Sequence, residues 1–142
     1  MISLQTVAIY DTEISGSIPP EIGLCSELRN FLLLWGNSLT GTIPPELSNC
    51  SSLVVFDVST NELSGQIPSE LGKLTSFFLW GNMVSGKILS SFGNCTELYS
   101  LDLSKNKLTD EIPDEIFGLK KLSKLLLLGN SLSGKIPNTP EA

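Results

Sequence analysis

The sequence lacks histidine altogether, and only 17% of its residues are charged. The absence of histidine removes the commonest general base and the commonest metal ligand. The three cysteines, Cys25, Cys50 and Cys95, show no CxxC spacing, and an odd number cannot close a complete set of disulfides. We therefore expect no metal site, no cofactor and no catalytic function.

A basic leader and long apolar segments are also missing. The opening residues, MISLQTVAIYDTEISG, lack the basic region and the continuous apolar core of a signal peptide. The longest apolar run, 31–35, is far shorter than the roughly 18 residues that a membrane helix needs. The net charge of -6 offers no attraction to nucleic acid or to an anionic membrane. We expect neither nucleic-acid binding nor direct membrane insertion.

One phrase, N-x-L-S-G-x-I-P, recurs along the chain. Its first residues are Asn37, Asn61, Asn82, Asn106 and Asn130, preceded by a copy that begins at Thr12. Its isoleucines are Ile18, Ile43, Ile67, Ile88, Ile112 and Ile136, at separations of 25, 24, 21, 24 and 24. Spacings this regular indicate a repeated structural unit of about 24 residues.

A second pattern, L-x-x-L-x-L-x-x-N, precedes each asparagine, as in Leu98, Leu101, Leu103 and Asn106. Leucines two apart share one face of a strand, so each LxL segment predicts a short strand with one buried face. A single repeat cannot bury its leucines alone, and its stability therefore depends on its neighbours. We expect an α/β solenoid of about six repeats, with parallel strands on a concave face and 3₁₀ or irregular segments on the convex side.

The predicted solenoid covers residues 1–137, followed by a short tail, 138–142. Its repeats lie near 4–27, 28–52, 53–73, 74–97, 98–121 and 122–137. Two junctions depart from the pattern: the segment from Leu28 to Asn37 is one residue too long, and the interval from Ile67 to Ile88 is short. We expect the short coil to close with a tightened convex side.

The repeated asparagines and glycines have predicted structural tasks. An amide side chain supplies both a donor and an acceptor, so stacked asparagines can satisfy backbone groups at the bend after each strand. We assign this ladder to Asn37, Asn61, Asn82, Asn106 and Asn130. Glycines at 16, 41, 65, 86 and 134 mark a tight turn. Asp110 occupies this position in the fifth repeat, where we expect a left-handed backbone.

These two patterns resemble the plant-specific class of leucine-rich repeats, found in receptor-like kinase ectodomains, receptor-like proteins and polygalacturonase inhibitors. The resemblance extends from Leu4 to Pro137, and segments such as NCSSLVVFDVSTNELSG and LSKLLLLGNSLSG are similar to receptors for root meristem growth factor peptides. It implies a leucine-rich repeat solenoid that binds a peptide or protein, with a co-receptor as a further partner of the full-length relative. Members of this family lie outside the cell at the plasma membrane. The localisation of this chain itself stays open.

The sequence also departs from that family. Its one arginine, Arg29, is followed by Asn30 and Phe31 and does not form the Arg-x-Gly-Gly motif of the growth-factor receptors. Polar capping units and a kinase segment are not visible, which favours a partial or repeat-deleted relative. Alternatives to peptide capture are inhibition of an extracellular polysaccharide-degrading enzyme and a truncated paralogue without function.

Aromatic and acidic residues occupy non-core strand positions and form the candidate ligand site. These residues are Tyr10, Trp35, Asp57, Phe78, Trp80 and Asp102, and the same positions in the third and fifth repeats include Ser59 and Ser104. Exposed aromatic side chains are enriched in binding sites. We expect an extended peptide to cross the strands over the aromatic residues while the two aspartates meet a cation. The alternative is that Trp35 and Trp80 simply pack beside the irregular junctions.

Three further motifs are interpreted as structural or as sites of modification. Asn49 and Asn94 begin N-x-S/T sequons and are candidate glycosylation sites in a secreted protein. The cysteines share one convex-side position, which favours burial as small hydrophobic residues. Two GxxxxGK segments, 81–87 and 129–135, lack the serine or threonine and the helix of a phosphate loop.

Overall fold

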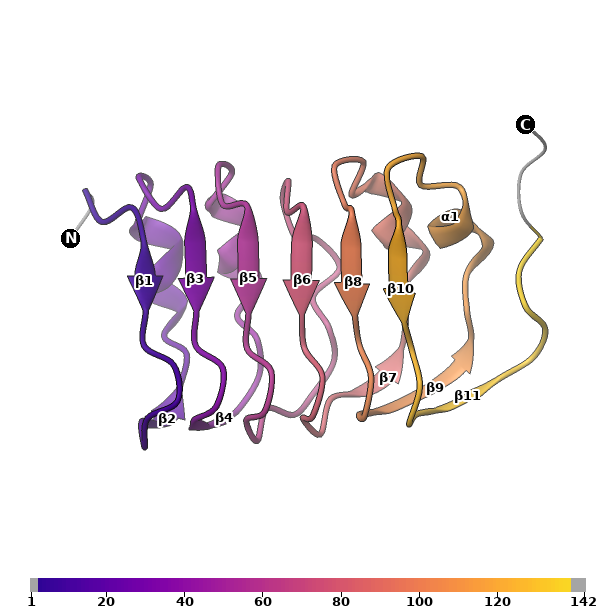
Figure 1. Ribbon diagram of the computed structural model, residues 1–142, viewed down its shortest axis with the longest axis horizontal. Coiled ribbons are helices and arrows are strands. Elements are labelled where there is room, and N and C mark those ends of the chain that lie inside the picture. The colour runs from indigo at the N-terminus through magenta and orange to yellow at the C-terminus, as the bar shows by residue number, and fades with distance from the viewer. Residues whose placement is uncertain (1–2, 139–142) are drawn as a thin grey trace.

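The computed structural model describes residues 3–138, which wind into a row of parallel coils with one strand of a common sheet in each coil (Figure 1). The sheet has six strands in the order β1-β3-β5-β6-β8-β10. They are β1 (Val7–Ala8), β3 (Phe31–Leu33), β5 (Val55–Asp57), β6 (Ser76–Phe78), β8 (Ser100–Asp102) and β10 (Lys124–Leu126). All pairs are parallel. The predicted solenoid with short parallel strands is confirmed.

Equivalent residues of successive repeats lie side by side in the core. Leu32 pairs with Phe56, Phe56 with Phe77, and Phe77 with Leu101. All four side chains are fully buried, and the rings of Phe56 and Phe77 stack with centroids 5.5 Å apart. Each of these side chains is therefore buried by the coil before it and the coil after it, which makes the stability of one coil depend on its neighbours.

Further short strands follow the bend in most coils and form two smaller parallel sheets. They are β2 (Ser15–Ser17) with β4 (Ser38–Thr40), and β7 (Ser85–Lys87), β9 (Lys107–Glu111) and β11 (Ser131–Ser133). At this bend the glycines predicted to lie in tight turns have positive φ angles, and Asp110 has φ +67°. The left-handed backbone expected at Asp110 is confirmed.

The isoleucines of the first four repeats point into the core from the wall opposite the strands, whereas Ile112 is only half-buried and Ile136 is exposed. Ile18, Ile43, Ile67 and Ile88 are at most 5% exposed. Ile136 is 82% exposed, and the expectation of a core position is wrong for this residue. Within residues 3–138 no further coil packs against its outer side, so its side chain lacks the neighbour that buries the first four isoleucines.

Helical turns cover the convex side of four coils. They are the 3₁₀ helices η1 (Pro20–Leu24), η2 (Pro45–Asn49) and η3 (Ser90–Asn94) and the short helix α1 (Asp114–Phe117). Cys25, Cys50 and Cys95 directly follow the three 3₁₀ helices and are buried free thiols, as their equivalent spacing predicted. The short coil has only a turn at Gly72 and Lys73 where four other coils have a helical turn. The expected tightening of its convex side is confirmed.

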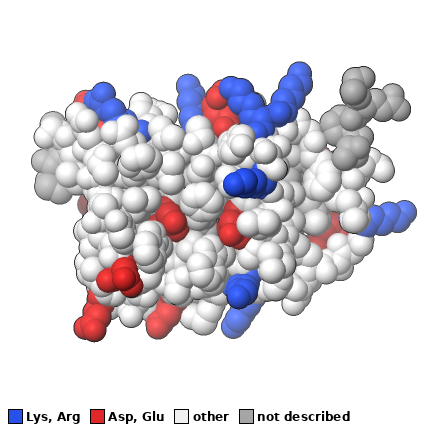
Figure 2. All heavy atoms as spheres, viewed as in Figure 1, with Lys and Arg blue, Asp and Glu red and all other residues white. Residues whose placement is uncertain are grey.

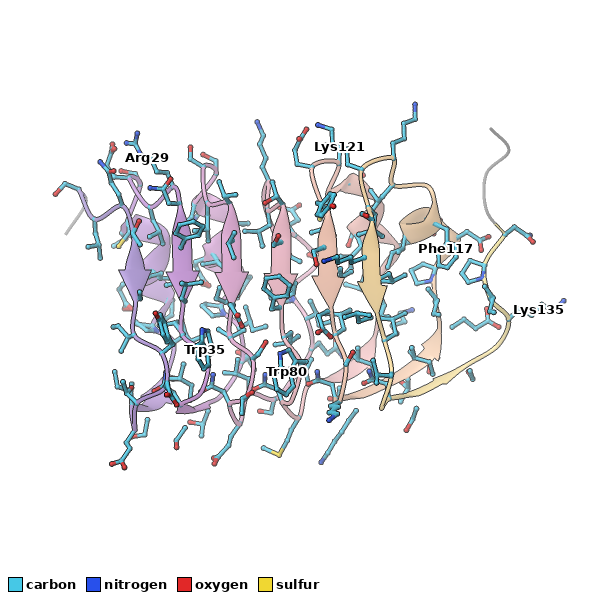
Figure 3. The ribbon with its side chains drawn as sticks, viewed as in Figure 1. Arg29, Trp35, Trp80, Phe117, Lys121 and Lys135 are labelled. Carbon is cyan, nitrogen blue, oxygen red and sulfur yellow. The ribbon has the colours of Figure 1, made fainter. Side chains whose placement is uncertain are left out.

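The extra residue of the second repeat is absorbed before its strand begins. The backbone N–H groups of Arg29 and Asn30 both donate to the carbonyl of Gln5, and Phe31 then pairs in normal register with Val55. Arg29 lies just before β3, at the end of the sheet where the strands begin, and forms an ion pair with Glu27 (Figure 3). The irregular junction therefore leaves the register of the six-stranded sheet unchanged.

Candidate functional site

The six-stranded sheet turns one face away from the helices, and this strand face carries the residues of the predicted ligand site. Its first row consists of the side chains next to the buried row, in the order Ala8, Leu33, Asp57, Phe78, Asp102 and Leu126. Backbone pairing holds these six residues in register across the sheet. Phe78 therefore lies between the two aspartates, one strand away from each.

A second row lies two residues further along each strand. The N–H of Asp11 donates to the carbonyl of Trp35, that of Gly36 to Ser59 and that of Thr60 to Trp80. Gly81 and Lys105 continue the same bonding to Ser104 and Leu128. The second row thus reads Tyr10, Trp35, Ser59, Trp80, Ser104 and Leu128. The sheet brings all six predicted ligand-site residues onto one face.

Exposure varies among these residues. Tyr10 and Trp80 are 44% and 41% exposed, whereas Trp35, Asp57, Phe78 and Asp102 are half-buried. Ser59 and Ser104 are only 2% and 5% exposed, so these two non-core strand positions are buried. Each small serine has Trp80 as a bulky neighbour in the row, which accounts for its burial. Leu126 and Leu128 extend the apolar surface and are 43% and 61% exposed.

Tyr10 and Trp35 form a stacked aromatic pair at one end of the strand face. Their ring centroids are 4.7 Å apart and their planes differ by 13°. Trp35 and Trp80 lie beyond the ends of their strands on the same side of the sheet (Figure 3). Trp35 thus stacks on Tyr10 of the first coil. This contact differs from the alternative in which Trp35 packs against residues of an irregular junction. The pair is a preformed apolar surface.

Two carboxylates, Asp57 and Asp102, and the exposed ammonium group of Lys124 give this face its charge. Oδ1 of Asp57 accepts the backbone N–H of Ser59 at 3.0 Å, and Oδ1 of Asp102 accepts that of Ser104 at the same distance. Burial raises the pKa of Asp57, the Ser59 backbone N–H lowers it, and the charge of Asp102 raises it further. Acidic groups separated by uncharged surface lie in the middle of this face (Figure 2). The face can therefore attract a cation and stack apolar groups.

The asparagine ladder holds the strand face in place. Oδ1 of Asn106 accepts the N–H of Val84, and its Nδ2 donates to the carbonyls of Leu79 and Leu103. Asn61 and Asn130 make the equivalent bonds to their own coil and to the preceding coil. Each amide thus joins two coils at the point where the chain leaves the strand.

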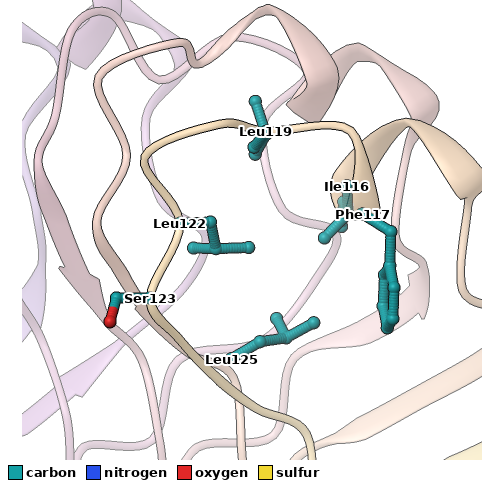
Figure 4. A pocket seen from close by; sticks show the side chains of 6 residues that line it. All are labelled: Ile116, Phe117, Leu119, Leu122, Ser123 and Leu125. Atoms are coloured by element: carbon teal, nitrogen blue, oxygen red, sulfur yellow. The ribbon is translucent and has the colours of Figure 1, made fainter. Parts of the chain in front are cut away.

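Among the depressions elsewhere on the surface, two of about 350 and 370 Å³ are lined partly by charged residues, namely Glu111, Asp114 and Lys135 in one and Lys87, Asp110 and Glu111 in the other. Two others are mainly apolar. One of about 180 Å³ lies at the outer side of the last coils and is lined by Ile116, Phe117, Leu119, Leu122, Ser123 and Leu125 (Figure 4). Another, of about 210 Å³, lies at the outer side of the first coils and is also mainly apolar. Neither contains an ionisable side chain. Across residues 3–138 no three potential metal ligands of the His, Cys, Asp and Glu types cluster together, and no helix is long and apolar enough to cross a membrane.

The comparisons with known proteins agree with the architecture. Family models described as leucine rich repeat match residues 30–50, 52–74 and 72–132. The crystal structure of a TDR receptor is similar at 35% identity and a TM-score of 0.88, over 94% of this chain and 24% of that one. A search of curated proteins finds no match. The chain belongs to the leucine-rich repeat family.

Within this family several structural relatives are ectodomains of plant receptor kinases, and a plant ice-binding protein is also similar at 27% identity and a TM-score of 0.81, over 96% of this chain and 44% of that one. The SOBIR1 ectodomain from Arabidopsis thaliana is 32% identical with a TM-score of 0.82, over 90% of this chain and 72% of that one. The plant peptide hormone receptor RGFR1 in complex with RGF2 is 33% identical with a TM-score of 0.67, over 94% of this chain and 26% of that one. The chain thus spans about a quarter of the length of the TDR and RGFR1 chains. The predicted relationship to plant receptor-kinase ectodomains is confirmed.

Proposed function

We propose that this chain captures an extended peptide, or an extended segment of a protein, on its strand face. The observation that carries the proposal is the alignment of Tyr10, Trp35, Phe78 and Trp80 on one open face, fixed by backbone pairing and by the asparagine ladder. Large aromatic side chains in such a place bury area with little loss of side-chain entropy. Because the coils already hold them in register, binding needs little rearrangement of the backbone.

The size of the face sets the length of the segment that it can hold. Six strands about 4.8 Å apart span about 24 Å. An extended chain covers about 3.3–3.6 Å per residue, so about seven residues cross the whole face. Such a ligand contacts strands from all the coils at once, which a small molecule cannot do.

Relatives support a peptide ligand and an extracellular position for the proposal. RGFR1 is a peptide hormone receptor in complex with RGF2, and a further neighbour is PEPR1 with AtPEP1. Asn49 and Asn94, the candidate glycosylation sites, are exposed at the ends of η2 and η3 on the convex side. Glycans there would lie opposite the strand face and leave it open. A co-receptor is a further partner to be sought in the longer relatives.

Inhibition of a cell-wall hydrolase is the competing function. That alternative favours a face rich in charge, whereas the two rows contain aromatic residues, leucines and two aspartates. Catalysis is disfavoured because each GxxxxGK segment runs into an extended strand or turn and not into a helix. Saturable heat on titration with a nucleotide would reverse that conclusion.

Immobilised protein tests the proposal when it is incubated separately with secreted plant peptides and with cell-wall hydrolases. We expect retention of peptides, lost in Trp80→Ala and kept in Tyr99→Ala. Tyr99 is a matched control because it is also exposed, at 52%, and precedes β8 outside the two rows. Retention of a hydrolase together with inhibition of its activity would favour the alternative. Capture of neither class by a folded, cooperatively melting chain would leave no evolved binding function, as in a non-functional paralogue.

A further inference from the structure

The middle of the strand face has a symmetrical arrangement of residues. Phe78 ends β6 and is followed two residues later by Trp80, and each neighbouring strand ends in an aspartate followed two residues later by a serine. These pairs are Asp57 with Ser59 after β5, and Asp102 with Ser104 after β8. The pair Phe78 and Trp80 thus lies between two identical Asp–Ser pairs. No other described strand is flanked in this way.

The two aspartates form no ion pair with a described cation, including Lys124 on the same face of β10. The ion pairs found in residues 3–138 are Arg29 with Glu27 and Lys121 with Glu97, both at exposed positions away from this face. Both aspartates are half-buried, and the Asp57 carboxylate is near enough to that of Asp102 for their charges to repel. Two half-buried like charges that form no ion pair oppose folding, so a bound cation would relieve them.

Two buried hydroxyl groups are also left without partners. Ser59 and Ser104 are more than nine-tenths buried, and their Oγ atoms have no hydrogen-bond partner among the described residues. The Ser59 hydroxyl nonetheless lies near enough to the Asp57 carboxyl to lower its pKa. Buried polar groups in native proteins are normally satisfied, and exceptions often mark a functional site. Each hydroxyl can donate a hydrogen bond to the neighbouring carboxylate when a bound ligand fixes the orientation of that carboxylate.

We propose that the strand face selects peptides that carry an arginine or lysine side chain, which lies over Phe78 between Asp57 and Asp102. This inference rests on the proposed function and names its ligand class. Each carboxylate is one strand, about 4.8 Å, from the strand of Phe78, so one cation reaches both. The aromatic ring adds a cation–π contact at the same place. A guanidinium is favoured because it presents five donors in a planar fork.

The stacked pair of Tyr10 and Trp35 sets a second requirement. Its centre lies two and a half strand spacings, about 12 Å, from β6 and two residues, about 7 Å, along the strand direction. The direct separation from Phe78 is therefore about 14 Å, which an extended chain covers in about four residues. The ligand then carries an aromatic or proline residue about four positions from its cationic residue.

Selection from a displayed library of linear twelve-residue peptides tests this inference on the folded chain. We expect enriched sequences with arginine or lysine about four positions from an aromatic or proline residue. The best peptide is then synthesised with its cationic residue and with glutamine in its place, and both are titrated against the native chain, Asp57→Asn and Asp102→Asn. Asp114→Asn, an exposed change of the same charge on α1, is the matched control.

If the peptide cation lies between the two aspartates, the effect of removing it should depend on whether both aspartates are present. Replacing the peptide cation should weaken binding to the native chain and to Asp114→Asn about ten- to a hundredfold, the range expected for a hydrogen bond to a charged group. The same replacement should weaken binding by a clearly smaller factor in Asp57→Asn or Asp102→Asn, because each variant keeps only one of the two carboxylates. Asparagine keeps an oxygen that accepts the serine N–H, so both variants are expected to fold.

The contrary outcomes are distinguishable. Peptides that bind in a Trp80-dependent manner without a cation, or whose cation shows no coupling to Asp57 or Asp102, would overturn the cation site and leave peptide capture standing. Failure to select any peptide would remove peptide capture and the cation site together.

Discussion

The replacement Asn106→Ala tests the asparagine ladder most sharply. Asn106 is 8% exposed, and its amide accepts from Val84 at 3.0 Å and donates to Leu79 at 3.1 Å and to Leu103 at 3.2 Å. Alanine leaves at least one buried N–H and one buried carbonyl without a partner. Each such group costs about 1–3 kcal/mol, so the free energy of unfolding should fall by about 2–5 kcal/mol.

Chemical denaturation and thermal melting, both followed by circular dichroism, measure this change. For a chain of this size about 1 kcal/mol corresponds to roughly 4 °C, so the midpoint temperature should fall by about 8–20 °C. Asn138→Ala is the control, because Asn138 is exposed beyond β11 and surface changes usually stay within about 0.5 kcal/mol. Equal midpoints for the two variants would refute the role assigned to the ladder.

Three further outcomes follow from the structure. Phe77→Ala should lower the free energy of unfolding by about 3–5 kcal/mol, because it empties a fully buried site between two coils, and an unchanged urea midpoint would contradict the shared core. Asp110→Gly should raise stability by up to about 1 kcal/mol, since glycine adopts φ +67° without steric cost, and thermal melting checks the sign. Burial raises the pKa of Asp57, so the folded chain binds a proton at this carboxyl more tightly than the unfolded chain does. The free energy of unfolding should therefore rise as the pH falls through the raised pKa. Urea titrations at several pH values measure this effect, and Asp57→Asn should remove it.

The regular parts of the fold could be predicted because their spacing reports directly on geometry. Leucines two apart specify a strand, and a period near 24 residues places equivalent leucines, isoleucines and asparagines next to one another. Leu101 and Ile88 are buried for this reason. The left-handed backbone at Asp110 followed from the glycines at the same position in other repeats.

Features that depend on neighbouring coils were beyond the sequence pattern. Alternation assigns Ser59 to an outward position, but its neighbours in the row are Trp35 and Trp80, and large side chains on both sides bury it. The extra residue at Arg29 changes only the turn before β3, which the repeat length alone cannot locate. Ile136 fits the core pattern yet is exposed, because burial needs a further coil beyond it.

The six predicted ligand-site residues were identified from strand alternation, and the structure adds their arrangement. The stacking of Tyr10 on Trp35 and the position of Phe78 between Asp57 and Asp102 come from backbone register across five repeats. The sequence pattern alone could not fix the pairing register of the strand in the second repeat, because one extra residue lies between Leu28 and Asn37. Whether these residues bind a ligand stays a prediction.

Tryptophan fluorescence tests the central claim most directly, because both tryptophans of the chain, Trp35 and Trp80, lie in the second row of the strand face. A selected peptide should shift their emission to shorter wavelength in a saturable manner, with the same dissociation constant as calorimetry, since the bound segment excludes water from both rings. The single variants Trp35→Phe and Trp80→Phe assign the change to each ring. Saturable binding by calorimetry with no change in the emission of either tryptophan would place the ligand elsewhere and contradict capture on the strand face.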